Sequence, residues 1–74
     1  MKATEIVRHI MKSKGVKIMT IADKLKIKSN VISVRLTQDN ISITKLDEML
    51  QLLDYKIMVV PSDTEGKDGW YQVR

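Results

Sequence analysis

Two short predicted helices, each with an apolar pattern at helical spacing and joined by the three residues 26–28, constrain the fold of this chain more than any other feature. The first pattern repeats at intervals of three and four residues and comprises Ile18, Ile21, Ala22 and Leu25. The second places Ile32 and Leu36 on one face of a following helix. Because the link is so short, we expect the two helices to meet at a steep angle. The small Ala22 then suits the close approach, and the lone apolar Ile27 of the link tucks beneath both helices.

Further helical patterns lie on both sides of this pair. Residues 4–14 carry the apolar stripe Ile6, Val7, Ile10 and Met11. Gly15 follows where a left-handed C-cap is favoured. The second helix of the pair begins at Lys28 or Ser29, of which Ser29 is the better cap. A fourth helix carries the stripe Leu46, Met49, Leu50 and Leu53. Its cap is Ser42 or Thr44, and Thr44 with Asp47 has the spacing of a capping box.

The last twenty residues change in character and predict strands. Residues 57–60 and 70–73 are rich in β-branched and aromatic side chains, which favours a hairpin with a long polar loop. Two strands alone are marginally stable in water, so they need a helix face or a second subunit. The predicted fold class is therefore mainly α: a four-helix-bundle-like domain over residues 1–54, with C-terminal β-strands over residues 55–74 as a dimerisation element.

Size and composition exclude several functional classes. A chain of 74 residues is one domain with a thin core. It has no cysteine and a single histidine, His9, so we expect no disulfide, metal or cofactor, and oligomerisation remains as the stabilising device. No apolar stretch approaches the roughly 18 residues of a membrane span, so we expect a cytoplasmic protein. Neither a glycine-rich phosphate loop nor a triad of nucleophile, histidine and carboxylate is present, so an enzyme is not expected.

Charge is divided unequally along the chain. Residues 1–45 carry ten Lys or Arg against three Asp or Glu, whereas residues 46–74 carry three against six. The front is therefore net +7 and the back net −3, within a total of +4. A solvated lysine surface explains this division as well as a face for a polyanion does, so charge alone leaves both interpretations open.

The order and spacing of three motifs resemble one known family. The motifs are the runs Ile21-Ala22-Asp23-Lys24-Leu25-Lys26-Ile27-Lys28-Ser29, Asn30-Val31-Ile32-Ser33 and Ile41-Ser42-Ile43-Thr44-Lys45-Leu46. Together they are similar to the phage-repressor (Xre/Cro-type) helix-turn-helix family, and residues 52–61 resemble the strand that ends a bacterial and phage subgroup of it. The resemblance implies a transcriptional regulator, expected to be a repressor, that binds double-stranded DNA. It would act as a homodimer on a palindromic operator.

The same resemblance implies roles for individual residues. Contacts to base edges are expected from Ser29, Asn30, Ser33 and Val34, because Asn pairs with adenine and Val contacts the thymine methyl. Contacts to the DNA backbone are expected from Lys17, Lys28, Arg35, Thr37, Asn40 and Lys45. Arg35 has the alternative of an i, i+4 ion pair with Asp39. The dimer interface is expected at Ile57, Met58, Val59, Trp70 and Tyr71.

Some positions depart from the family pattern. Lys26 stands where the turn usually has glycine, so it must tolerate the local backbone conformation or change it. Asp39 and Asn40 replace the glycine that follows the second helix of the motif, and Asn tolerates left-handed geometry. Ile18 and Ser29 stand where phage repressors often have glutamines, which removes one familiar way of reading adenine.

Two other functions remain open. An antitoxin or a phage-encoded protein-interaction module can reuse the same fold, and the acidic segment 63–68 would then be a partner-binding element. RNA binding is less favoured, since single-strand recognition needs aromatic stacking residues on the basic surface. The chain's aromatic residues, Tyr55, Trp70 and Tyr71, all lie outside its basic part.

Overall fold

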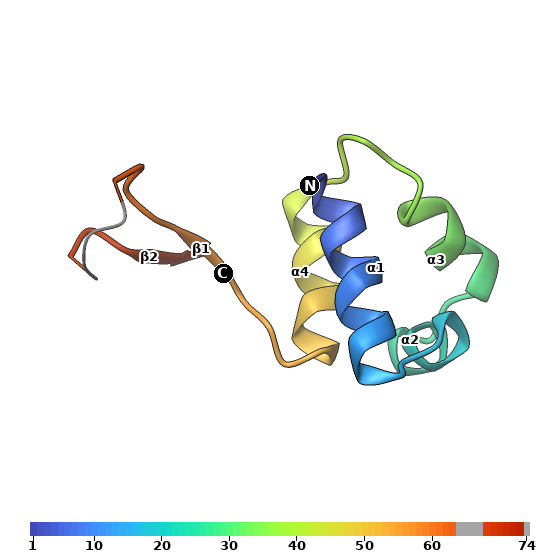
Figure 1. Cartoon of the computed structure of the whole chain (residues 1–74). Coiled ribbons are helices and arrows are strands. Elements are labelled where there is room, and N and C mark those ends of the chain that lie inside the picture. Colours follow the sequence, from blue (N-terminus) through green and yellow to red (C-terminus); the bar gives the residue numbers. More distant parts are fainter. Residues whose placement is uncertain (64–67, 74) are drawn as a thin grey trace.

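Four helices followed by a two-stranded antiparallel sheet make up the structure, a computed structural model that describes residues 1–63 and 68–73 (Figure 1). The elements are α1 (Ala3–Lys14), α2 (Ile18–Leu25), α3 (Ser29–Arg35), α4 (Ile43–Leu52), β1 (Ile57–Val59) and β2 (Tyr71–Val73). The predicted mainly helical class with a C-terminal hairpin is thus confirmed. No helix in these two ranges is long and apolar enough to cross a membrane.

The core lies between the helices and receives side chains from all of them. Helix α2 packs against α3, and both α1 and α2 pack against α4. The five largest fully buried side chains are Val7, Ile21, Ile32, Met49 and Leu53. Ala22 is 2% exposed, as its place at the helix crossing requires, and Ile27 packs against the core from the link. The apolar spacing that predicted helices α2 to α4 therefore also predicted what they bury.

One residue of the apolar stripe predicted for α1 is not buried. Ile6 is 42% exposed, whereas Thr4 is buried with 4% of its surface exposed. Thr4 lies in line with Val7 and Met11 at helical spacing, and its hydroxyl donates to the carbonyl of Gln38 at 3.2 Å. A buried hydroxyl that finds an acceptor costs little, so the polar residue takes the inward position and Ile6 is left outside.

For two helix caps the sequence left two alternatives open, and the structure selects Lys28 rather than Ser29 for α3 and Ser42 rather than Thr44 for α4. Helix α3 has Lys28 as its N-cap, without a side-chain hydrogen bond, and Ser29 is already helical. Helix α4 begins at Ile43, where the Ser42 hydroxyl accepts from the N–H of Lys45 at 3.3 Å. The capping box from Thr44 to Asp47 does not form, because both residues lie inside α4.

The turn between α2 and α3 contains a lysine in a conformation that favours glycine. Lys26 has φ 57° and ψ 43°, in the left-handed region. Its N–H donates to the carbonyl of Asp23 at 3.2 Å, and the N–H of Ile27 donates to Ala22 at 3.0 Å. This pattern closes the C-terminus of α2 and directs the chain into α3. The turn therefore adopts the left-handed conformation at position 26 although a lysine, and not a glycine, occupies it.

Replacing Lys26 with glycine is expected to raise the free energy of unfolding by about 1 kcal/mol. A residue with a Cβ pays roughly 1–2 kcal/mol in the left-handed region, and glycine returns part of that gain through its freer unfolded chain. The measurement is urea unfolding followed by circular dichroism. Lys24→Gly is the matched control, since it removes the same charge from the helical part of α2, and it should cost about 1 kcal/mol. Shifts in the same direction for both variants would contradict the prediction.

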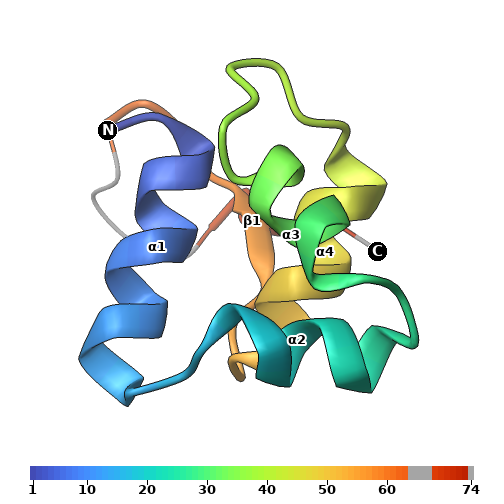
Figure 2. The ribbon, with the colours of Figure 1, turned by 90° about the vertical axis from the view of Figure 1, so that its right-hand side faces the viewer.

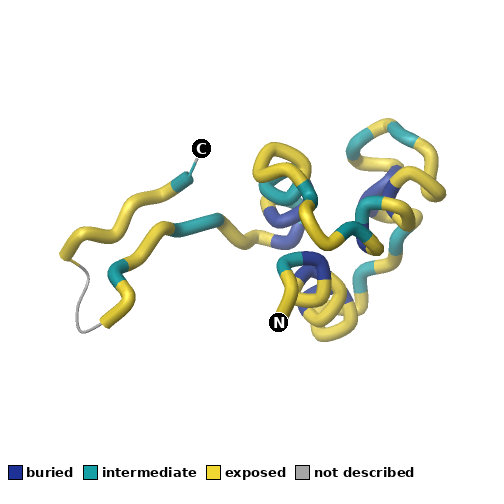
Figure 3. Tube along the Cα trace, turned by 90° about the horizontal axis from the view of Figure 1, so that it is seen from above, coloured by how far each residue is buried: buried dark blue, intermediate teal, exposed yellow. Residues whose placement is uncertain are grey.

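The hairpin stands apart from the helices at the end of the chain (Figure 1) and is exposed along most of its length (Figure 3). Its strands pair Ile57 with Val73, Met58 with Gln72 and Val59 with Tyr71. Both strands are one residue shorter than predicted, because Val60 and Trp70 fall outside the ladder. Within the described hairpin, Ile57 reaches the helical core and packs against it. Of the polar loop, residues 64–67 lie outside the described part of the chain.

Candidate nucleic-acid interface

Helix α3 presents one face to solvent, which we call the outer face of α3. It comprises Ser29, Asn30, Ser33 and Val34, all exposed. Their spacing of one and four residues puts them on one side of the helix. The other side is anchored by Ile32, which is 0% exposed. Figure 2 shows α3 joined to α2 by the tight turn, with α1 to one side. The structure thus brings the four residues predicted to contact bases onto one accessible surface.

The residues predicted to contact a DNA backbone are exposed at the ends of helices, with one exception. Lys17 and Lys28 are the N-cap residues of α2 and α3, and Lys45 lies in the first turn of α4. Asn40 is exposed in the loop before α4. Thr37 follows α3, and its hydroxyl donates its one proton to the carbonyl of Val34 at 2.7 Å, so a phosphate oxygen would have to compete with that carbonyl for it. The exception is Arg35.

Arg35 points away from the outer face of α3 and toward α4. Its guanidinium donates to Glu48 at 3.0 Å, and its side chain is only 13% exposed. Asp39, the other candidate partner, instead accepts from Lys2 at 2.8 Å. The predicted pair of Arg35 with Asp39 is therefore wrong. The cause lies in the tertiary structure. Helix α4 places the carboxylate of Glu48 beside the side of α3 that carries both Ile32 and Arg35.

Glu48→Gln is expected to lower the free energy of unfolding by about 1 kcal/mol. The change leaves a mostly buried guanidinium without its counter-charge, although the 44% exposure of Glu48 means that solvent already screens the pair. Arg35→Met should cost less, because methionine fills similar space and the remaining carboxylate is well solvated. Urea unfolding of both variants measures this order. The reverse order would mean that the pair contributes mainly through packing.

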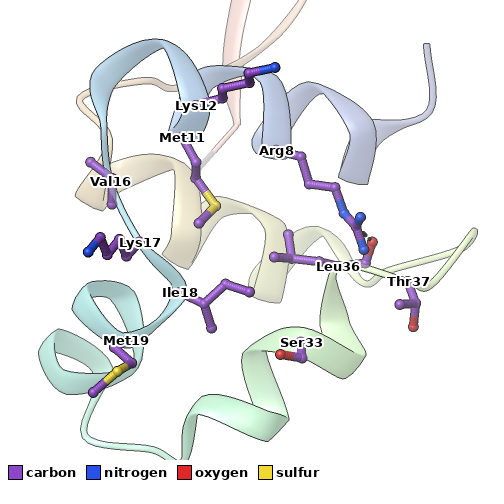
Figure 4. A pocket seen from close by; sticks show the side chains of 10 residues that line it. All are labelled: Arg8, Met11, Lys12, Val16, Lys17, Ile18, Met19, Ser33, Leu36 and Thr37. Carbon is purple, nitrogen blue, oxygen red and sulfur yellow. Dashed lines mark hydrogen bonds between the residues drawn. The ribbon is translucent and has the colours of Figure 1, made fainter.

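An apolar groove adjoins the outer face of α3 (Figure 4). It has a volume of about 640 Å³, and its lining residues are Arg8, Met11, Lys12, Val16, Lys17, Ile18, Met19, Ser33, Leu36 and Thr37. None of these described lining residues is acidic. Lys17, Ser33 and Thr37, separated by up to 20 positions in the sequence, line this one groove. Two cations of α1 that were not predicted from the sequence, Arg8 and Lys12, also line this groove.

The two missed cations carried a signal in the sequence. Arg8 and Lys12 are four residues apart, so they lie on one side of α1. Arg8 is fixed in place, since its Nε donates to the carbonyl of Leu36, just after α3, at 3.2 Å. A basic i, i+4 pair on a helix indicates a face. It does not indicate that this face adjoins α3, which depends on how the helices pack.

The hairpin carries a second exposed surface, which we call its apolar face. The strand register places Ile57, Val59, Tyr71 and Val73 on the same side of the ladder, and all four are apolar or aromatic. Val59 is 56% and Tyr71 is 68% exposed. Of the predicted interface residues, Met58 lies on the opposite side, paired with Gln72. Trp70, 38% exposed, precedes the ladder.

The described residues contain no group of three or more His, Cys, Asp or Glu side chains placed to hold a metal ion. Comparison with protein-family models, curated proteins and solved structures gives no match for this chain. The outer face of α3 and the apolar face of the hairpin are the two surfaces of the protein that bear on its function.

Proposed function

We propose that α2, the turn at Lys26 and α3 form a helix-turn-helix. The protein would bind double-stranded DNA at specific sequences and act as a transcriptional repressor. The outer face of α3 is the observation that carries this proposal. Its four side chains are short, uncharged and exposed, so the helix can approach base edges closely in the major groove. Ile32 and the Arg35–Glu48 pair hold the opposite side of α3.

The surrounding charges support the same proposal. Lys17 and Lys28 flank α2 and α3, and Arg8 and Lys12 reach the groove from α1. Cations of this kind contact phosphates, fix the register of a protein on the duplex and supply most of the affinity that does not depend on sequence. In this arrangement the uncharged outer face of α3 would recognise the bases, and the cations around it would bind the phosphates.

A homodimer is the second part of the proposal. The apolar face of the hairpin leaves Val59 and Tyr71 exposed, and a two-stranded sheet is marginally stable by itself. A second copy would cover the same face on both subunits through a two-fold axis. Two copies of α3 would then contact half-sites about one helical turn apart, roughly 34 Å, on a palindromic operator.

Salt-dependent binding to duplex DNA tests the proposal first. Six to ten phosphate contacts are expected to lower the affinity on the order of 10³-fold or more between 50 and 200 mM salt. Lys28→Ala should weaken binding to all sequences alike and reduce the salt slope by about one. Asn30→Ala and Ser33→Ala should instead reduce the preference among sequences. Lys56→Ala, in the segment before β1, is the matched control and should change neither quantity.

A protein-interaction module is the second candidate function. The exposed Val59 and Tyr71 would suit a different protein as well as a second copy. Of the acidic segment, Asp63 and Asp68 are described and exposed. The absence of any binding to DNA at low salt, together with a stable hetero-complex in place of a homodimer, would favour this function.

A further inference from the structure

The outer face of α3 lacks the side chain that most often reads guanine. Guanine is recognised through its O6 and N7 acceptors by Arg or Lys, adenine by Asn or Gln, and thymine by apolar contact with its methyl group. The four residues of the face are two serines, Asn30 and Val34. The helix does contain an arginine, but Arg35 is 13% exposed and bound to Glu48 at 3.0 Å.

The remaining chemistry of the face favours A·T pairs. Asn30 offers the donor and acceptor that match adenine. Val34 is an apolar side chain that is 57% exposed to solvent. A partner that covers it would therefore gain free energy from the burial of apolar surface. Lys28 is exposed, but it is the N-cap residue before the first turn of α3 and is not one of the four residues of the face.

We propose that the operator half-sites have A·T pairs opposite Asn30 and Val34, and that contact of Val34 with a thymine methyl contributes to affinity. This inference rests on the proposed DNA-binding function and specifies which base pairs it reads. Covering one methyl group corresponds to about a fourfold change in affinity. Two half-sites bound by a dimer would therefore give roughly a tenfold change or more.

The test replaces thymine with deoxyuridine, which keeps the hydrogen-bonding edge of the base and removes only the C5 methyl. Preferred sequences are first selected from a random duplex pool at low salt. Dissociation constants are then measured at one salt concentration for the selected duplex with thymine or with deoxyuridine in both half-sites. The wild type should lose about tenfold on the deoxyuridine duplex, whereas Val34→Ala, which keeps only the Cβ of the apolar side chain, should lose a clearly smaller factor.

Val31→Ala is the matched control, because Val31 is a valine of the same helix, 40% exposed, outside the four-residue face. This variant should keep the sensitivity to the methyl group. Half-sites rich in G·C, or equal binding of the two duplexes by the wild type, would overturn the inference and leave the DNA-binding function in place. A pool from which nothing is selected at low salt would overturn both. Circular dichroism of each variant establishes that it is folded.

Discussion

Ile32→Ala is expected to lower the free energy of unfolding by about 2–5 kcal/mol, because it removes a fully buried side chain and leaves a cavity. Ile32 is 0% exposed and comes from the side of α3 opposite its outer face. A domain of 74 residues has a total stability of roughly 4–11 kcal/mol at the usual values per residue. One substitution therefore removes a large part of the total, and α3 loses the contact that anchors it.

Urea unfolding followed by circular dichroism measures this effect, and the same helix provides the control. Val34→Ala truncates a side chain that is 57% exposed and should change the free energy of unfolding by less than about 0.5 kcal/mol. The two substitutions lie two residues apart and both remove β-branched side chains. Equal midpoints for the two variants would show that α3 is not held by Ile32. A large loss for Val34→Ala would show that the outer face is covered in the isolated protein.

The sequence was sufficient to predict the helices and most of the core, because both follow from local spacing. Apolar residues that recur every three or four positions must share a side of a helix, and only the interior can cover that side. Ile21, Ala22 and Ile32 are buried for this reason. The outer face of α3 was predictable by the same argument, since its members occupy the positions that the apolar spacing leaves free.

Features that depend on a distant partner could not be predicted in this way. Thr4 is buried because the carbonyl of Gln38, 34 residues away, accepts from its hydroxyl. Arg35 is withdrawn from solvent because α4 brings Glu48 beside it, 13 residues along the chain. In each case a polar group changes its exposure when tertiary structure supplies a partner. This pairing also affects the candidate interface, because Arg35, the only arginine of α3, is not available to contact a partner there.

If the proposed homodimer forms, Tyr71→Glu is expected to convert it to monomers and to weaken binding to a palindromic duplex by about 10²–10⁴-fold. The substitution places a charge on the apolar face of the hairpin, where it would have to lose its hydration on dimerisation. In the proposed assembly, binding to a palindrome gains from two linked half-site contacts, and that gain is lost when the subunits separate. Binding to a single half-site should change little, since the outer face of α3 is untouched.

Gln72→Glu is the matched control for Tyr71→Glu. Gln72 is the next residue of β2 and lies on the opposite side of the ladder, so it introduces the same charge without entering the apolar face. Sedimentation equilibrium gives the oligomeric state, and titration of whole and half operators gives the affinities. A Tyr71→Glu dimer, or equal wild-type affinity for whole and half operators, would contradict the proposed assembly. Loss of the dimer with Gln72→Glu as well would point to both sides of the hairpin, and then Met58, on the side of Gln72, would belong to the interface.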